Sequence, residues 1–326
     1  MKIAVVGCGA VGSYYGAKLC RAGRDVHFLL RSDYDVVRRN GVLIRSFQGD
    51  FTVQPRCANR PEDIGASDLV LVALKTTAND EFARLLPPLV GRKTAVLTLQ
   101  NGLGNEEQLA RLFPVGQIMG GLCFVCLRRV EPGVIHHTDH GRIVIGEFQR
   151  PATARTREFA AMFRAAGVPC DVTDTLAQAH WEKLVWNVPF NGLGVAGIVG
   201  HEAVVRGELP KDKGRISASC LPTDRLLADP HWTQLLRELM NGILAAADAL
   251  GMPASPELAG RLFALTRTMG AYKASTLLDF ERGLPLELES LFLEPLRRAN
   301  QAGVRTPRLE NLCRILCALN AKQEGV

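Results

Sequence analysis

The chain contains no long hydrophobic run. The apolar residues after Lys2 end at Gly7, too early for a secretory signal peptide, and no later stretch approaches the length of a transmembrane helix. With 47% apolar and 22% charged residues, the composition is that of an ordinary globular protein. We therefore expect a cytoplasmic protein without a membrane partner, and its 326 residues suffice for two domains with full cores.

The sequence also lacks a disulfide framework and a basic block. Its nine cysteines are odd in number, scattered and mostly in apolar surroundings, which indicates reduced, buried thiols. Cys123 and Cys126 match a C-x-x-C pattern inside a strand-like run without a second pair, so we interpret them as core residues. The net charge of +6 is spread along the chain and gives a nucleic-acid partner little support.

Signature motifs of several enzyme classes are missing. The sequence has no G-x-S-x-G nucleophile elbow and no phosphate-loop lysine, so hydrolase and phosphotransferase chemistry would lack a site. His136, His137, Asp139 and His140 suggest a metal cluster, but neighbouring residues of a strand point to opposite faces. Because no separate Cys or carboxylate completes a recognisable ligand spacing, we expect no metal.

A dinucleotide-binding pattern stands at the start of the chain. A short strand-like run leads into a G-x-G-x-x-G segment, and a helical pattern follows to Ala22; the segment is Gly7, Cys8, Gly9, Ala10, Val11 and Gly12. In that order the glycines allow a tight turn, an approach to a pyrophosphate and close packing of the helix. A second predicted strand, 25–30, ends at Arg31 and Ser32, where an NAD enzyme would carry an acid. We predict that this segment and Arg31 bind NADP(H), because a cation favours the 2′-phosphate.

The first half of the chain alternates strands and helices. Continuous apolar runs at 69–73 and 94–99 are typical of buried parallel strands, with predicted helices at 80–90 and 105–112. Hairpins are expected at 42–55 and 128–147, then a helix at 153–166 and a strand at 168–172. This pattern predicts a Rossmann-type, doubly wound α/β domain over residues 1–173.

The second half, residues 174–326, shows no convincing strand pattern. We expect an all-helical domain here, with helices over 176–199, 231–250, 255–268, 270–282, 286–302 and 308–322. Lys183, Asn187 and Asn191 recur every fourth residue on a stretch that is otherwise almost wholly apolar. They would share one face of a buried helix, and a polar stripe there needs a partner. A snorkelling lysine beside two paired asparagines is the structural alternative.

Two further polar residues follow predicted strands. Asn101 lies in Gln100-Asn101-Gly102, and Lys75 comes directly after the apolar run that ends at Leu74. Ligands of open α/β sheets bind at the carboxyl ends of strands, so Asn101 could contact nicotinamide or substrate and Lys75 could contact phosphate or ribose. An ordinary turn and a solvated loop lysine are the alternatives.

These elements resemble the ketopantoate reductase (2-dehydropantoate 2-reductase) family nearly end to end. The matching elements occur in the family's order: the glycine segment, Arg31, Leu74-Lys75, Gln100-Asn101-Gly102, Trp181-Glu182-Lys183 with Asn187 and Asn191, Ser275 followed by Glu287, and Gly303-Val304 with Pro307. The resemblance implies NADPH-dependent reduction of 2-dehydropantoate to pantoate, on the way to pantothenate and coenzyme A. It implies Lys183 as general acid, Asn101 at the nicotinamide and substrate, and Asn187, Asn191, Ser275 and Glu287 as substrate ligands.

The chain departs from the family pattern at three places. Leu286-Glu287-Leu288-Glu289 replaces a common Thr-Glu-Ile-Asp, Leu293 stands where a small residue is common, and the segment 200–222 is longer. The first two could reshape the substrate pocket, and the third could be a surface loop or a lid. A reductase of another small 2-keto acid and a non-catalytic NADP sensor remain as alternatives, and a homodimer is an open option.

Overall fold

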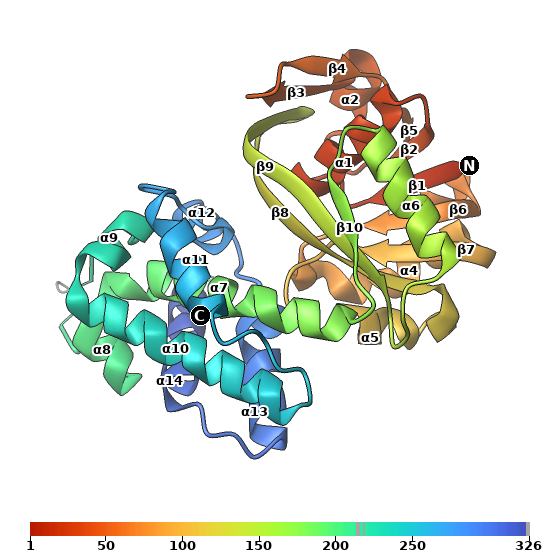
Figure 1. Cartoon of the computed structure of the whole chain (residues 1–326). Helices are drawn as coiled ribbons and strands as arrows, with labels where there is room; N and C mark the ends of the chain where they lie inside the picture. Colours follow the sequence, from red (N-terminus) through yellow and green to blue (C-terminus); the bar gives the residue numbers. More distant parts are fainter. Residues whose placement is uncertain (213–215, 218, 324–326) are drawn as a thin grey trace. The chain divides into compact units, whose positions relative to one another are not determined.

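The computed structural model describes residues 1–212, 216–217 and 219–323, and the chain divides into two compact units, residues 1–176 and 177–326 (Figure 1). Three residues of the charged piece in the longer segment, Lys213, Gly214 and Arg215, lie outside the described residues.

The first unit is built around one sheet. Its strands are β1 (Lys2–Val6), β2 (Asp25–Leu29), β3 (Val42–Ser46), β4 (Phe51–Val53), β5 (Arg56–Ala58), β6 (Ser67–Val72), β7 (Val90–Thr98), β8 (Ile118–Glu131), β9 (Val134–Glu147) and β10 (Cys170–Val172). Its helices are α1 (Ala10–Arg21), α2 (Tyr34–Asn40), α3 (Pro61–Ile64), α4 (Phe82–Leu85), α5 (Asn105–Ala110) and α6 (Ala154–Ala165).

The sheet contains a complete Rossmann core. The strands β5-β2-β1-β6-β7-β8 are all parallel and lie in the order 3-2-1-4-5-6 of dinucleotide-binding folds. After β1, the chain adds β2 and then β5 on one side of β1, and it next adds β6 on the other side of β1. This reversal places a ligand crevice at the carboxyl ends of β1 and β6. The predicted doubly wound α/β domain is confirmed.

Alternate residues of the central strands serve two separate cores. Ile3 and Val5 face the core that includes side chains of α1 and α6, whereas Ala4 and Val6 face the core under α3, α4 and α5. Helices therefore cover both faces of the sheet, and Figure 1 shows α1 and α6 against it. Burial on both faces explains why these strands are continuous apolar runs.

Two hairpins extend the sheet beyond the Rossmann core. The β8–β9 pair is antiparallel, β3 runs parallel to β9, and β4 pairs antiparallel to β3. Both predicted hairpins are confirmed, although the second begins at Ile118 rather than at 128. The predicted helix 80–90 is wrong: a 3₁₀ turn, Thr76–Glu81, leads into the four-residue α4, and β7 already starts at Val90. Pro87 and Pro88 explain this, since neither has an N–H for a longer helix.

The second unit is helical, and the described part of it contains no strand, as predicted. Its helices are α7 (Leu176–Ala196, which begins at the boundary), α8 (His201–Arg206), α9 (Thr223–Ala228), α10 (Pro230–Ala249), α11 (Leu258–Arg267), α12 (Ser275–Glu281), α13 (Glu294–Gln301) and α14 (Pro307–Gln323). The expected helix 270–282 starts only at Ser275, because Gly270 has a φ of +61°. The expected helix 286–302 consists of a π-helical stretch, Glu289–Leu293, and α13.

Glycines let two helices approach α7 closely. A Cβ at Gly192 would come within 2.6 Å of Leu312 on α14, and one at Gly194 within 2.3 Å of Leu277 on α12. A side chain at either position would require the facing leucine to move, so the leucines of α12 and α14 pack closely against the backbone of α7. Among the described helices, none combines the length and the apolar character that crossing a membrane requires.

Candidate active site

The four predicted cofactor elements lie at one edge of the sheet. The strands β2, β1, β6 and β7 are successive parallel neighbours, so their carboxyl ends lie side by side. Arg31 follows β2, the glycine segment follows β1, Lys75 follows β6, and Asn101 follows β7. The fold thus gathers residues that lie far apart in sequence, from Gly7 to Asn101.

The glycine segment has the shape that a pyrophosphate requires. Gly7 has a φ of +95°, and a Cβ there would lie 2.3 Å from the backbone nitrogen of Leu74, so only glycine fits. At Gly9, by contrast, a Cβ would meet nothing within 4 Å, which leaves open space above the loop. Gly9 is also the N-cap of α1, and no side chain of this fully described loop caps the helix. The free N–H groups and the open space fit a bound phosphate group.

The loop is held in place from below. The hydroxyl of Ser13 donates a hydrogen bond to the carbonyl oxygen of Cys8 at 2.9 Å. Burial raises the pKa of the Cys8 thiol, and the nearby side chains of Cys57 and Asp33 raise it further. The thiol is therefore neutral and serves packing rather than reaction, while the Asp33 carboxylate lies within electrostatic range of the loop.

Arg31 stands exposed at the end of β2. Within the described part of the chain its side chain has no ion-pair partner, so it is available to an anionic ligand. The hydroxyl of Ser32 donates a hydrogen bond to Asp33 Oδ1 at 3.0 Å. Asp33 in turn pairs with Arg129 of β8. The sequence pattern marks Arg31 and Ser32 but neither member of this ion pair.

A chain of side-chain amides connects the loops after β6 and β7. Gln100 Nε2 donates to the carbonyl of Leu74 at 3.0 Å and to Asn79 Oδ1 at 2.7 Å. Asn79 Nδ2 donates to Asn105 Oδ1 at 3.0 Å, and Asn105 Nδ2 donates to the carbonyl of Asn101 at 3.1 Å. These contacts fix the backbone beside Lys75 and at Asn101. Asn79 and Asn105 were not predicted, since nothing in their local sequence marks them.

In the second unit, the predicted polar stripe lies on the buried helix α7. Asn187 is 8% exposed and Asn191 is 2% exposed, while Lys183 is half-buried. Leu184, Val188 and other apolar residues of α7 are fully buried. The stripe therefore interrupts an apolar environment, in which its polar groups must be satisfied by hydrogen bonds.

The structure brings Asn191 and Ser275 together. Asn191 Oδ1 accepts a hydrogen bond from the backbone N–H of Thr276 at 3.0 Å and one from the Ser275 hydroxyl at 3.4 Å. The amide oxygen is thus held by the first turn of α12, where helix N–H groups lack partners within the helix. This fixes the orientation of the Asn191 amide and turns its NH₂ group away from α12.

Glu287 lies in the loop that precedes the π-helical stretch. It is 5% exposed, and the backbone N–H of the preceding residue, Leu286, donates to Asn320 Oδ1 of α14 at 2.9 Å. Glu289, by contrast, is exposed and forms an ion pair with Arg297 at 2.6 Å. Of the two departures from the family pattern beside Glu287, the Glu289 side chain therefore lies at the surface, whereas Leu286 is buried. Single π-turns are frequent at functional sites.

The histidines considered as metal ligands in the sequence, for which no metal was expected, make structural contacts. His137 is buried between Tyr14 and Phe47, its Nδ1 lies 2.9 Å from the Ser46 hydroxyl, and its Nε2 lies 3.0 Å from the carbonyl of His140. Burial lowers the pKa of His137 despite these contacts. Among the described residues no group of three potential ligands is arranged around a metal position.

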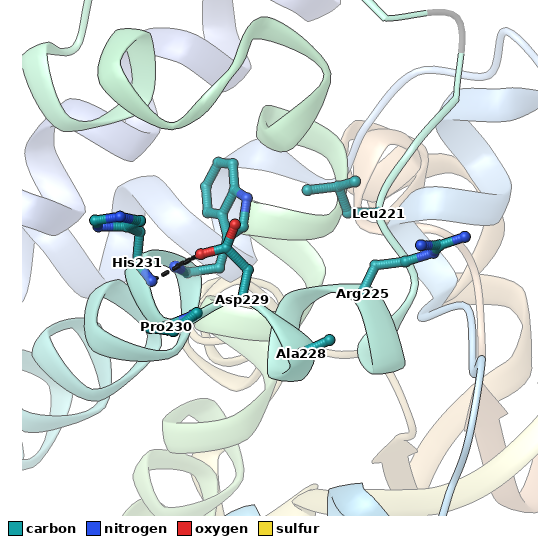
Figure 2. A pocket seen from close by; sticks show the side chains of 7 residues that line it. Leu221, Arg225, Ala228, Asp229, Pro230 and His231 are labelled. Carbon is teal, nitrogen blue, oxygen red and sulfur yellow. Dashed lines mark hydrogen bonds between the residues drawn. The ribbon is translucent and has the colours of Figure 1, made fainter.

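Figure 2 shows a surface pocket of the second unit, lined by Leu221, Arg225, Ala228, Asp229, Pro230, His231 and Trp232. The carboxylate of Asp229 accepts hydrogen bonds from the backbone N–H groups of His231 at 2.7 Å and Trp232 at 3.4 Å. It therefore caps α10. None of the predicted site residues lines this pocket, and we assign it no part in the reaction.

Comparisons with known proteins agree with this architecture. Models of the ketopantoate reductase PanE/ApbA family and of its C-terminal domain match residues 3–150 and 218–320. A 2-dehydropantoate 2-reductase of Nostoc sp. is 38% identical over 95% of this chain and 92% of its own length. The crystal structure of 2-dehydropantoate 2-reductase from Geobacter metallireducens GS-15 is 44% identical, covers 98% of this chain and 99% of its own, and has a TM-score of 0.88.

A more distant structure shares only the fold. The ternary structure of D-mandelate dehydrogenase with NADH and anilino(oxo)acetate has a TM-score of 0.85 at 17% identity and covers 99% of both chains. The fold, the glycine segment and these relatives define a nicotinamide-dependent oxidoreductase. Within that class, the chain belongs to the ketopantoate reductase family.

Proposed function

We propose that this protein reduces 2-dehydropantoate to pantoate with NADPH, in the cytoplasm. The family, the names of its relatives and the predicted site residues support this assignment. All nine cysteines are free thiols, which agrees with a reducing compartment.

The observation that carries the proposal is the stripe Lys183, Asn187 and Asn191 on the buried helix α7. The bound cofactor would supply a hydride to the keto carbon, which leaves negative charge on the carbonyl oxygen. The ammonium group of Lys183 would stabilise that charge and donate the proton. The amide NH₂ groups of Asn187 and Asn191 would hold the substrate carboxylate without offering a competing acidic proton.

The residues around the glycine segment fit a phosphorylated dinucleotide. The open space over Gly9 and the uncapped start of α1 would receive the pyrophosphate, and Arg31 would bind the 2′-phosphate. Arg31 is the residue that would contact the 2′-phosphate and so favour NADPH, because the fold by itself also accommodates NADH, as in D-mandelate dehydrogenase. Lys75 and Asn101 would bind ribose or nicotinamide at the neighbouring strand ends.

Glu287 would recognise the hydroxyl group of the substrate. Because Glu287 is almost completely buried, a hydrogen bond from the substrate hydroxyl to its carboxylate would be favourable. An analogue without the hydroxyl would leave the carboxylate with one hydrogen bond fewer and would bind less well. The test compares kcat/KM for 2-dehydropantoate with that for 3-methyl-2-oxobutanoate, which lacks the hydroxymethyl group. We expect 2-dehydropantoate to be preferred about five- to 150-fold, which corresponds to about 1–3 kcal/mol.

The variant Glu287→Ala should lose most of this preference. Equal rates on both compounds in the wild type would refute the role of Glu287 and favour a reductase of another 2-keto acid, for which the buried Leu286 beside Glu287 is the structural reason. NADPH binding without turnover of any small 2-keto acid would instead indicate a cofactor sensor.

A further inference from the structure

Asp33 is an acid close to the predicted cofactor site. It lies between β2 and α2, two positions after Arg31, and occupies the N-cap of α2. Its carboxylate also contributes to the raised pKa of Cys8 in the glycine segment, which places it within electrostatic range of that loop. An acid near the end of β2 normally selects NAD, because it binds the ribose hydroxyls and repels a 2′-phosphate.

The Asp33 carboxylate does not act as a cap. Aspartate at an N-cap ordinarily accepts a hydrogen bond from the following helix turn, but in α2, all of whose residues are described, no such bond forms. The carboxylate turns instead to Arg129 of β8, which is far away in sequence. A favourable local contact is therefore given up for a long-range one.

Arg129 binds Asp33 through both arms of its guanidinium group. Nε donates to Oδ2 at 2.9 Å and Nη2 donates to Oδ1 at 2.5 Å, the bidentate geometry of the strongest ion pairs. Ser32 adds a hydroxyl donor at 3.0 Å, and the Asp33 side chain is only 8% exposed. Burial raises the pKa of Asp33, but the bonds from Arg129 and Ser32 and the backbone N–H of Gly133 outweigh it, so the net pKa is lowered. Asp33 is ionised, neutralised and turned inward.

We propose that Arg129 sets the cofactor preference by holding the Asp33 carboxylate away from the adenosine ribose. This inference rests on the proposed use of NADPH at Arg31. Arg31, Asp33 and Arg129 together carry one net positive charge, which suits a 2′-phosphate. Without Arg129 the net charge becomes zero, and the released carboxylate can repel the phosphate or accept a hydrogen bond from a ribose hydroxyl. Arg129 is thus a positioning residue that acts through Asp33.

The test measures the dissociation constants of NADPH and NADH by fluorescence titration, which requires no turnover. In Arg129→Met, the preference for NADPH over NADH should fall about tenfold or more, equivalent to about 1.4 kcal/mol. The double variant Asp33→Asn with Arg129→Met restores the single positive charge and should recover the wild-type preference. Arg129→Lys, which keeps the charge, should retain most of it.

A control separates charge from damage to the fold. Arg142 of β9 pairs with Asp171 of β10 at 2.7 Å, so Arg142→Met removes an arginine–aspartate pair from the same hairpin with the same change in net charge. It should leave the preference unchanged. If Arg129→Met does not fold, Arg129→Gln, which removes the charge and the bidentate contact but keeps one donor for Asp33, should show a smaller fall in the same direction.

Two results overturn the inference. One is an Arg129→Met or Arg129→Gln protein with the wild-type preference; the other is a double variant whose preference stays as low as that of the single one, which would mean that Arg129 acts only on the fold. A wild-type protein that binds both cofactors equally would instead refute the proposed cofactor.

Discussion

Asn105 should be essential to the loop that carries Asn101. Its side chain is fully buried and joins two groups: Oδ1 accepts from Asn79, and Nδ2 donates to the carbonyl of Asn101. Asn105→Ala removes both bonds. Each lost hydrogen bond costs a net free energy of about 1 kcal/mol, and a buried polar group left without any hydrogen-bond partner costs up to about 3 kcal/mol. The free energy of unfolding of this unit should therefore fall by about 2–4 kcal/mol. For a unit of this size that corresponds to a fall in Tm of about 4–16 °C.

The functional effect of Asn105→Ala should exceed that of its lost stability. Well below the Tm, the loosened Asn101 loop should raise the KM for NADPH or keto acid several-fold. Asn105→Asp is the matched control for the contact with Asn79, because it keeps that acceptor and loses only the donor to Asn101. A Tm of Asn105→Ala within about a degree of the wild type, or wild-type kinetics of Asn105→Asp, would refute this role of Asn105.

Three further outcomes follow from the site and the sheet. Lys183→Ala should keep its fold, since alanine is the best helix former and this position is half-buried, and it should still bind NADPH. Its kcat should fall about 10²–10⁴-fold in a stopped-flow assay. Near-normal turnover would exclude Lys183 as the proton donor. Arg31→Asp should lower the preference for NADPH over NADH about ten- to a hundredfold by titration, and an unchanged preference would place the 2′-phosphate elsewhere. Burial raises the pKa of Glu147, but hydrogen bonds from Thr156, Arg150 and Arg155 outweigh it and lower the pKa below 4.5. The stability that this carboxylate provides is therefore present above about pH 4.5 and lost as the pH falls further, and urea titrations of Glu147→Gln should show a smaller loss than the wild type.

Regular burial made most of the sheet predictable from sequence. The central strands have cores on both faces and therefore consist of continuous apolar residues, and the glycine segment has its shape imposed locally. Several short elements, among them α3, α8, α9 and β5, were missed because they contain too few residues to show a period. Tertiary contacts alone define them.

The site residues also fall into those that the local sequence predicts and those that only tertiary contacts define. The glycine segment, Arg31 and the stripe on α7 carry signals in their spacing, whereas Ser275 is unremarkable until α12 is packed against Asn191. Asn79, Asn105 and Arg129 could not have been found, because no motif surrounds them and the contacts Asn79–Asn105 and Arg129–Asp33 join residues far apart in sequence. Their importance arises from the order of the strands, which local propensity does not encode.

The contact between Gly194 and Leu277 has a consequence for sequence variation. An alanine at 194 would look harmless in a helix, yet its methyl group would have to displace Leu277, two residues from Ser275. Any shift of α12 that accommodates this movement would alter the contact between Ser275 and Asn191, and with the proposed substrate roles of these two residues it would weaken substrate binding. Substitutions that aim to change the substrate preference should therefore be made on α7 and α12 together.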